Sequence, residues 1–99
     1  MPNTKLTVIA RILAKEEKRD FVKSELLKLL EITRAEEGCI NYNLHQDIEN
    51  PNLFVFYENW TSKELLNKHL KNQHLVDYVK NTEGSVDEFI LNELEEINN

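Results

Sequence analysis

Apolar residues recur along this chain with two different periods, and the change from one period to the other predicts its secondary structure. Alternating or uninterrupted apolar residues, rich in β-branched and aromatic types, are typical of strands. They occupy four stretches: Leu6–Ala14, Cys39–Gln46, Leu53–Trp60 and Val86–Ile97. Between the first two stretches the apolar spacing becomes 3.6 residues, which predicts a helix that buries Val22, Leu26, Leu29 and Leu30.

Turn residues separate these elements. Glu36-Glu37-Gly38 ends the first helix, and we expect Gly38 to adopt the left-handed conformation of a helix cap. The segment Asp47–Asn52 contains Pro51 between two asparagines, so it predicts a turn that joins the second and third strands as a hairpin.

A helix pattern follows the third strand almost at once. Thr61 with Glu64 three residues later matches a capping box, so we expect a helix to begin there. Leu65, Leu66 and Leu70 form its apolar face, which the polar residue His69 interrupts. After a break at Asn72-Gln73, a shorter third helix is predicted from the spacing of Leu75, Val76 and Val79.

The predicted order is strand, helix, strand, strand, helix, helix, strand (βαββααβ), in one domain that spans residues 1–99. This order is typical of an α+β, ferredoxin-like sandwich, in which helices cover one face of an antiparallel sheet. The first and third strands, however, carry apolar residues on both faces. Because helices cover only one face, we expect a second copy of the chain to cover the other in a homodimer.

Composition and charge argue against several classes of partner and site. A net charge of -6 argues against a nucleic-acid partner and against an anionic membrane surface. No apolar run approaches the roughly 20 residues of a membrane helix, and the N-terminus lacks the pattern of a signal peptide. The single cysteine, Cys39, fits a reducing cytoplasm. His45, His69 and His74 have no Cys or carboxylate at ligand spacing, so we expect no metal site.

His69 is the strongest candidate for chemistry. It lies about 12 Å along its helix, which places it above the Phe56 to Glu58 part of the third strand if the helix folds back. A neutral imidazole there could take a proton from a phenol, or it could simply hold helix to sheet through a hydrogen bond to Glu58. Trp60 shares a strand face with Glu58 and could equally be a substrate wall or ordinary core. His74 could line a pocket mouth or cap its helix.

The chain resembles a known family at these same residues. Glu36-Glu37-Gly38-Cys39, the run Phe54–Trp60, and the spacing Glu58-x-Trp60-x(8)-His69-x(4)-His74 are similar to the antibiotic biosynthesis monooxygenase family, more narrowly to its small bacterial quinol-monooxygenase-like members. The resemblance runs from the first strand to the last and implies a dimeric α+β barrel with a pocket in each subunit.

From that resemblance we expect a monooxygenase that needs no cofactor and oxidises a small quinol or polyphenol with dioxygen. The expected catalytic residues are His69, Trp60 and Glu58. The residues expected to bind substrate are Phe54, Phe56, Leu66 and His74.

Two departures from the family keep other functions open. Antibiotic-tailoring members carry an Asn where this chain has Phe56, and haem-degrading members carry an Asn on the first strand, where the polar residues here are Thr7 and Arg11. The alternatives are a non-enzymatic dimeric module that binds a small aromatic ligand and, less favoured, a haem-degrading monooxygenase or a small-molecule isomerase.

Overall fold

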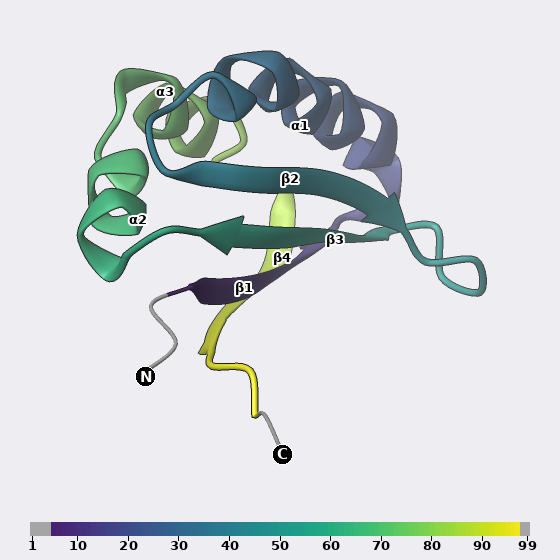
Figure 1. Ribbon diagram of the computed structural model, residues 1–99. Helices are drawn as coiled ribbons and strands as arrows, with labels where there is room; N and C mark the ends of the chain where they lie inside the picture. Colours follow the sequence, from purple (N-terminus) through teal and green to yellow (C-terminus); the bar gives the residue numbers. More distant parts are fainter. Residues whose placement is uncertain (1–4, 98–99) are drawn as a thin grey trace.

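The computed structural model describes residues 5–97, and the predicted order of elements is confirmed there (Figure 1). A short 3-10 turn, η1 (Glu16–Lys18), precedes the first helix. The strands are β1 (Leu6–Ala14), β2 (Cys39–Gln46), β3 (Leu53–Trp60) and β4 (Val86–Leu94); the helices are α1 (Arg19–Arg34), α2 (Lys63–Leu70) and α3 (Gln73–Asn81). β4 ends at Leu94, three residues before the predicted end at Ile97; Leu94 lies opposite Thr7, near the start of β1, and acidic residues follow it.

The four strands form one antiparallel sheet in the order β2-β3-β1-β4. The register places Val8 opposite Glu58 and Ala10 opposite Phe56, so these residues share a face. All three helices lie on that side of the sheet (Figure 1). The architecture is therefore the α+β, ferredoxin-like sandwich that the order of elements predicts, and the core lies between the sheet and α1.

The start of α2 differs from the prediction. Ser62, not Thr61, is the N-cap, and its side-chain oxygen accepts the backbone N–H of Leu65 at 3.2 Å. Both residue types are good caps, so the Thr61–Glu64 spacing favours the wrong one. The backbone N–H of Thr61 instead donates to the carbonyl of Gly38, in the loop after α1, at 2.9 Å.

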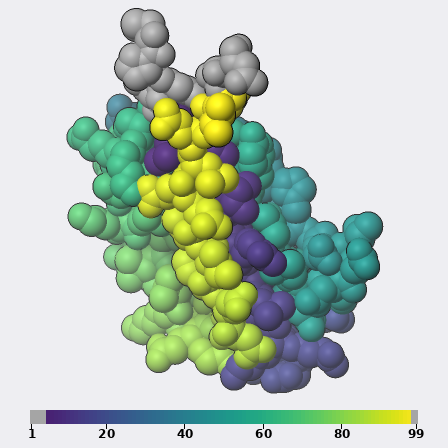
Figure 2. Space-filling model, turned by 90° about the horizontal axis from the view of Figure 1, so that it is seen from below, coloured from purple at the N-terminus to yellow at the C-terminus, as the bar shows by residue number. Residues whose placement is uncertain are grey.

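The other face of the sheet carries no helix, and a group of apolar residues lies on it among polar ones such as Arg11, Asn43 and His45. β1 and β4 run across this face in the space-filling view (Figure 2). The register assigns to it Ile9, Leu13, Leu53, Val55, Tyr57, Ile90 and Leu94. Tyr57 is 42%, Ile90 36% and Leu94 44% exposed, which is unusual for clustered residues of these types. Within residues 5–97, no helix is long and apolar enough to cross a membrane.

Candidate functional site

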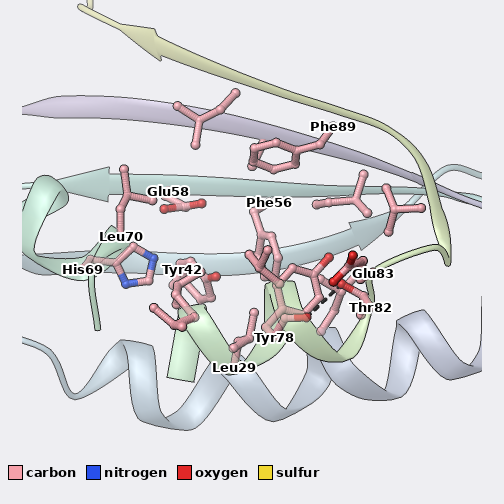
Figure 3. A pocket seen from close by; sticks show the side chains of 18 of the residues that line it. Leu29, Tyr42, Phe56, Glu58, His69, Leu70, Tyr78, Thr82, Glu83 and Phe89 are labelled. Atoms are coloured by element: carbon pink, nitrogen blue, oxygen red, sulfur yellow. Dashed lines mark hydrogen bonds between the residues drawn. The ribbon is translucent and has the colours of Figure 1, made fainter. Parts of the chain in front are cut away.

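A cavity of about 650 Å³ lies between the helix-facing side of the sheet and the three helices. All four strands and all three helices contribute to its wall, which is mostly aliphatic and aromatic. Figure 3 shows His69 and Glu58 at one end of this cavity and Thr82 and Glu83 at the other. Phe89, which is 58% exposed, lies on β4 at the wall, so the cavity opens between β4 and α3.

His69 reaches this cavity from α2, on the face that α2 turns toward the sheet. Its side chain is only 2% exposed, and its ring lies 4.6 Å from the Trp60 ring and 5.6 Å from the Tyr42 ring, measured between centroids. Aromatic neighbours on two sides fix the plane of the imidazole, because an aromatic ring in van der Waals contact leaves few alternative rotamers.

The carboxylate that binds His69 is Glu36, a residue of the segment Glu36-Glu37-Gly38-Cys39 that resembles the family but not one that we expected in the site. Nδ1 of His69 donates to Oε2 of Glu36 at 2.6 Å. Glu58, the partner that we expected, instead accepts the indole N–H of Trp60 at 2.9 Å. With Nδ1 engaged by Glu36, Nε2 is the ring nitrogen left for a molecule in the cavity; no hydrogen bond engages it among residues 5–97.

Glu36 is itself held from several sides. Asn72, between α2 and α3, donates to its Oε1, while Nε2 of His74 lies 3.0 Å from its Oε2. Thr33 Oγ1 lies 3.3 Å from the same His74 nitrogen. The Glu36 side chain is 12% exposed. A carboxylate with this many partners has little freedom, so it fixes the direction of the imidazole as well as its tautomer.

Gly38 explains how Glu36 comes so close to α2. Its φ of +88° is in the left-handed region, as predicted for the end of the first helix segment. A Cβ at Gly38 would lie 2.5 Å from Cδ1 and 2.8 Å from Cβ of Leu65 on α2, closer than real contacts allow. The glycine therefore lets the loop after α1 pack directly against α2 and deliver Glu36 to His69.

Burial shifts the proton affinities of the polar groups in the site. Burial lowers the pKa of His69, although the hydrogen bond to Glu36 opposes this, so the imidazole favours its neutral form. Burial likewise raises the pKa of Glu58 to about 7, with the Trp60 hydrogen bond acting in the opposite direction. The cavity thus presents a neutral base and, near neutral pH, a carboxyl group that is protonated in part of the molecules.

The residues that we expected to be catalytic or to bind substrate divide into two groups. Phe56, Glu58 and His69 line the cavity. Phe54 and Leu66 are fully buried in the core, and Trp60 lies behind His69 without being part of the cavity wall.

His74 also lies away from the cavity. It lines a separate hollow of about 270 Å³ between α1 and α3. Its expected place at the mouth of the main pocket is therefore not what the structure shows.

Cys39 is half-buried, and burial raises the pKa of its thiol to about 11. Because the thiolate is the nucleophilic form, this agrees with a structural cysteine.

The apolar cavity with a few convergent polar groups, set between the sheet and helices of an α+β sandwich, has the composition that is typical of small-molecule sites. The sequence matches the family described as Antibiotic biosynthesis monooxygenase over residues 5–81, and the chain belongs to this family.

Individual relatives agree with this assignment. YcnE of Bacillus subtilis, whose name proposes a monooxygenase activity, is 34% identical over 70 residues, covering 71% of this chain and 74% of YcnE. Rv0793 of Mycobacterium tuberculosis, similarly named, is 30% identical over 73 residues, covering 74% of this chain and 71% of its own. Against an uncharacterised Synechocystis protein, sll1783, the chain is 27% identical and spans only 51% of that protein's length.

The crystal structure of PA3566 from Pseudomonas aeruginosa superposes with a TM-score of 0.93 at 30% identity, covering 99% of both chains. A crystal structure described as antibiotic biosynthesis monooxygenase superposes with a TM-score of 0.89 at 29% identity, covering 94% of this chain and 99% of the other. The fold is therefore shared along almost the whole length of this chain.

Proposed function

We propose that this protein is a monooxygenase that oxidises a small quinol or polyphenol with dioxygen and uses no cofactor. The observation that carries the proposal is the buried His69–Glu36 pair at the end of an apolar cavity. Membership of the antibiotic biosynthesis monooxygenase family and the names of two relatives support the reaction class.

The cavity suits a small aromatic ligand. Its volume of about 650 Å³ is within the roughly 300–1,000 Å³ of typical small-molecule sites. Phe56 and Leu29 supply flat and aliphatic walls for a ring, and the polar groups gather at the two ends (Figure 3). A phenol would therefore lie with its ring among the apolar side chains and one hydroxyl directed at Nε2 of His69.

His69 begins the reaction as a general base. The phenolic proton moves to Nε2, and the Glu36 carboxylate on Nδ1 stabilises the imidazolium that forms. The resulting phenolate is electron-rich enough to give one electron to dioxygen, after which the radical pair combines to a ring peroxide. The protein contributes position, exclusion of water and a proton acceptor, while the substrate supplies the electrons.

The reaction balances without a further reductant. A quinol and one O₂ give a hydroxyquinone and one water, so one oxygen atom enters the ring and the other leaves as water. As the peroxide O–O bond breaks, the ring carbon that bound oxygen loses its C–H proton and becomes a carbonyl carbon. That proton and the one returned by the imidazolium of His69 convert the departing oxygen to water, and the Glu58 carboxyl, at the same end of the cavity, donates a hydrogen bond to it. Trp60 acts as a positioning residue that supports the His69 ring.

The test is a screen of reduced quinols and polyphenols with an oxygen electrode, followed by ¹⁸O₂ labelling of the product. We expect one labelled oxygen atom per product molecule. Oxygen uptake without label in the product would indicate an oxidase instead. Saturable binding of the same compounds with no uptake at all would indicate the non-enzymatic binding module.

We further propose that a second copy of the chain covers the helix-free face of the sheet. The apolar residues of that face, Val55 and Tyr57 among them, lie in the middle of the sheet, where a two-fold partner would present the same surface. Such an interface is self-complementary because each copy offers the identical apolar patch. Removing this area from water favours association in the same way that it favours folding.

Analytical ultracentrifugation of a Val55→Glu variant tests the dimer. The wild-type protein should sediment as a dimer at micromolar concentration, and the variant should shift to a monomer or unfold because a carboxylate is placed in the interface. Ile48→Glu is the control, since Ile48 lies at the hairpin tip and is 98% exposed. A well-folded wild-type monomer at that concentration contradicts the proposal.

A further inference from the structure

Three side chains from separate parts of the chain bring potential metal ligands together behind the cavity. One potential ligand atom each from Glu36, His69 and His74 lies within 4.8 Å of the other two, and Oε2 of Glu36 contacts both Nδ1 of His69 and Nε2 of His74. They come from α2, from α3 and from the loop after α1. No local motif in the sequence predicts this group, because Glu36 lies 33 residues before His69.

We propose that Glu36, His69 and His74 form a binding site for a divalent transition-metal ion of the zinc class. Two imidazole nitrogens and one carboxylate oxygen are a set that Zn²⁺ takes with a fourth position left for water or another ligand. The same set suits other first-row metals, with affinity rising toward Cu²⁺. Mg²⁺ and Ca²⁺ prefer six or more oxygen ligands, so this site discriminates against them.

The three ligand atoms, which lie within 4.8 Å of one another, must adjust to the separation that a tetrahedral ion imposes. Zn²⁺ with ligands at about 2.0–2.1 Å separates tetrahedral ligand atoms by about 3.3 Å. In the structure Oε2 of Glu36 is 2.6 Å from Nδ1 of His69 and 3.0 Å from Nε2 of His74. The carboxylate therefore has to withdraw by several tenths of an ångström, which rotation of a glutamate side chain provides.

The surroundings hold the ligands in place and leave a route for the ion. Asn72 donates to the second oxygen of Glu36, and the Trp60 ring fixes the imidazole of His69, so two ligands have outer partners that set their direction. His74 lines the separate 270 Å³ hollow between α1 and α3. An ion would therefore enter from that side, without passing through the apolar cavity.

Metal binding would also change the His69 tautomer, a consequence that rests on the proposed function. With the ion on Nδ1, the neutral imidazole carries its proton on Nε2, which is the nitrogen needed to take the phenolic proton. A metal-bound His69 cannot act as the base. Zn²⁺ at this site would thus inhibit the monooxygenase.

Isothermal titration calorimetry with Zn²⁺ alone, on chelator-treated full-length protein at pH 7.5, tests the site. We expect one ion per chain. Glu36→Gln and His74→Gln should each weaken binding at least about 100-fold, since loss of outer partners alone weakens metal sites by 10–100-fold. Glu37→Gln and His45→Gln are matched controls at exposed residues of the same two types, and Cys39→Ser controls for binding by the thiol. These three variants should bind like the wild type.

Several results would overturn the proposal: no binding by the wild type at tens of micromolar Zn²⁺, binding that survives in folded Glu36→Gln and His74→Gln, or binding that disappears in Cys39→Ser. Circular dichroism establishes that each variant is folded. Co²⁺ substitution adds a second readout, because tetrahedral Co²⁺ has an intense visible absorption that weakly bound surface ions lack.

Where a quinol substrate is found, the ratio of turnover with and without Zn²⁺ completes the test. Addition of Zn²⁺ should lower turnover by the wild type at least tenfold, whereas the ratio should stay near one in His74→Gln. An unchanged ratio in the zinc-loaded wild type would overturn the inhibitory role. The calorimetry needs no substrate, so a failure of the proposed function and a failure of the metal site give different results.

Discussion

Replacing Glu58 with glutamine should make the protein more stable above neutral pH while changing little in acid. Glu58 is only 4% exposed, and burial raises its pKa from the ordinary 4.5 to about 7. A folded-state pKa above the unfolded value means that the folded protein retains a proton which the unfolded chain releases. The stability that this proton provides is complete below pH 4.5 and is lost as the pH rises to the folded pKa.

The size of the effect follows from the same values. At about 1.4 kcal/mol for each pH unit between 4.5 and about 7, the Glu58 carboxyl lowers the free energy of unfolding by about 3 kcal/mol over that range. Glutamine has nearly the same shape and keeps an oxygen to accept the Trp60 N–H, but it does not titrate. The advantage of Glu58→Gln over the wild type should therefore grow from near zero at pH 4.5 to about 3 kcal/mol at pH 8.

Urea unfolding measured from pH 4.5 to pH 8 at one protein concentration provides the test. Trp60 is the only tryptophan and lies in the core, so its fluorescence reports the transition. Glu31→Gln, which removes an exposed carboxylate from α1, is the control for loss of one charge. If the wild-type and Glu58→Gln stabilities stay parallel across this range, the argument that burial suppresses ionisation of Glu58 is wrong.

Two further predictions concern the packing of the loop after α1 against α2. Gly38→Ala should lower the free energy of unfolding by about 2–4 kcal/mol, because it combines a left-handed backbone with a clash against Leu65. Gly84→Ala is the comparison: Gly84 has a φ of +82°, but no atom lies within 4 Å of the new Cβ, so this variant should lower the same free energy by only about 1–2 kcal/mol. Equal losses in thermal unfolding would contradict the close approach at Gly38. Ser62→Ala should lower the unfolding free energy by about 1 kcal/mol and more than Thr61→Ala does, and the opposite ranking in urea unfolding would restore Thr61 as the cap.

Local patterns in the sequence were enough to predict the elements and their order. The strand Leu53–Trp60 matches its predicted ends because β-branched and aromatic residues fill it and Pro51 precedes it. The cap of α2 was misplaced by one residue because Thr61 and Ser62 have similar side chains. Which of them faces the helix depends on the link from Thr61 to Gly38, a contact between segments far apart in the sequence.

The site was predictable only in part for the same reason. His69 could be chosen because it interrupts a leucine stripe, which is a local signal. Glu36 and Glu37 are chemically alike neighbours, and only the fold turns Glu36 inward while Glu37 stays exposed. The one hint was Gly38, because a glycine that must allow close approach also brings its neighbours close to the facing helix.

The most direct test of the account compares turnover of one quinol under dioxygen by the wild type, His69→Ala and Glu36→Gln. We predict that His69→Ala lowers turnover by about 10²–10⁴-fold and leaves the oligomeric state unchanged. Glu36→Gln should lower turnover by a smaller factor, because the glutamine oxygen can still accept the hydrogen bond from Nδ1 of His69 but carries no charge to stabilise the imidazolium. His45→Ala, an exposed histidine on β2, should match the wild type. Turnover by folded His69→Ala equal to that of the wild type would contradict the central claim that His69 is the base.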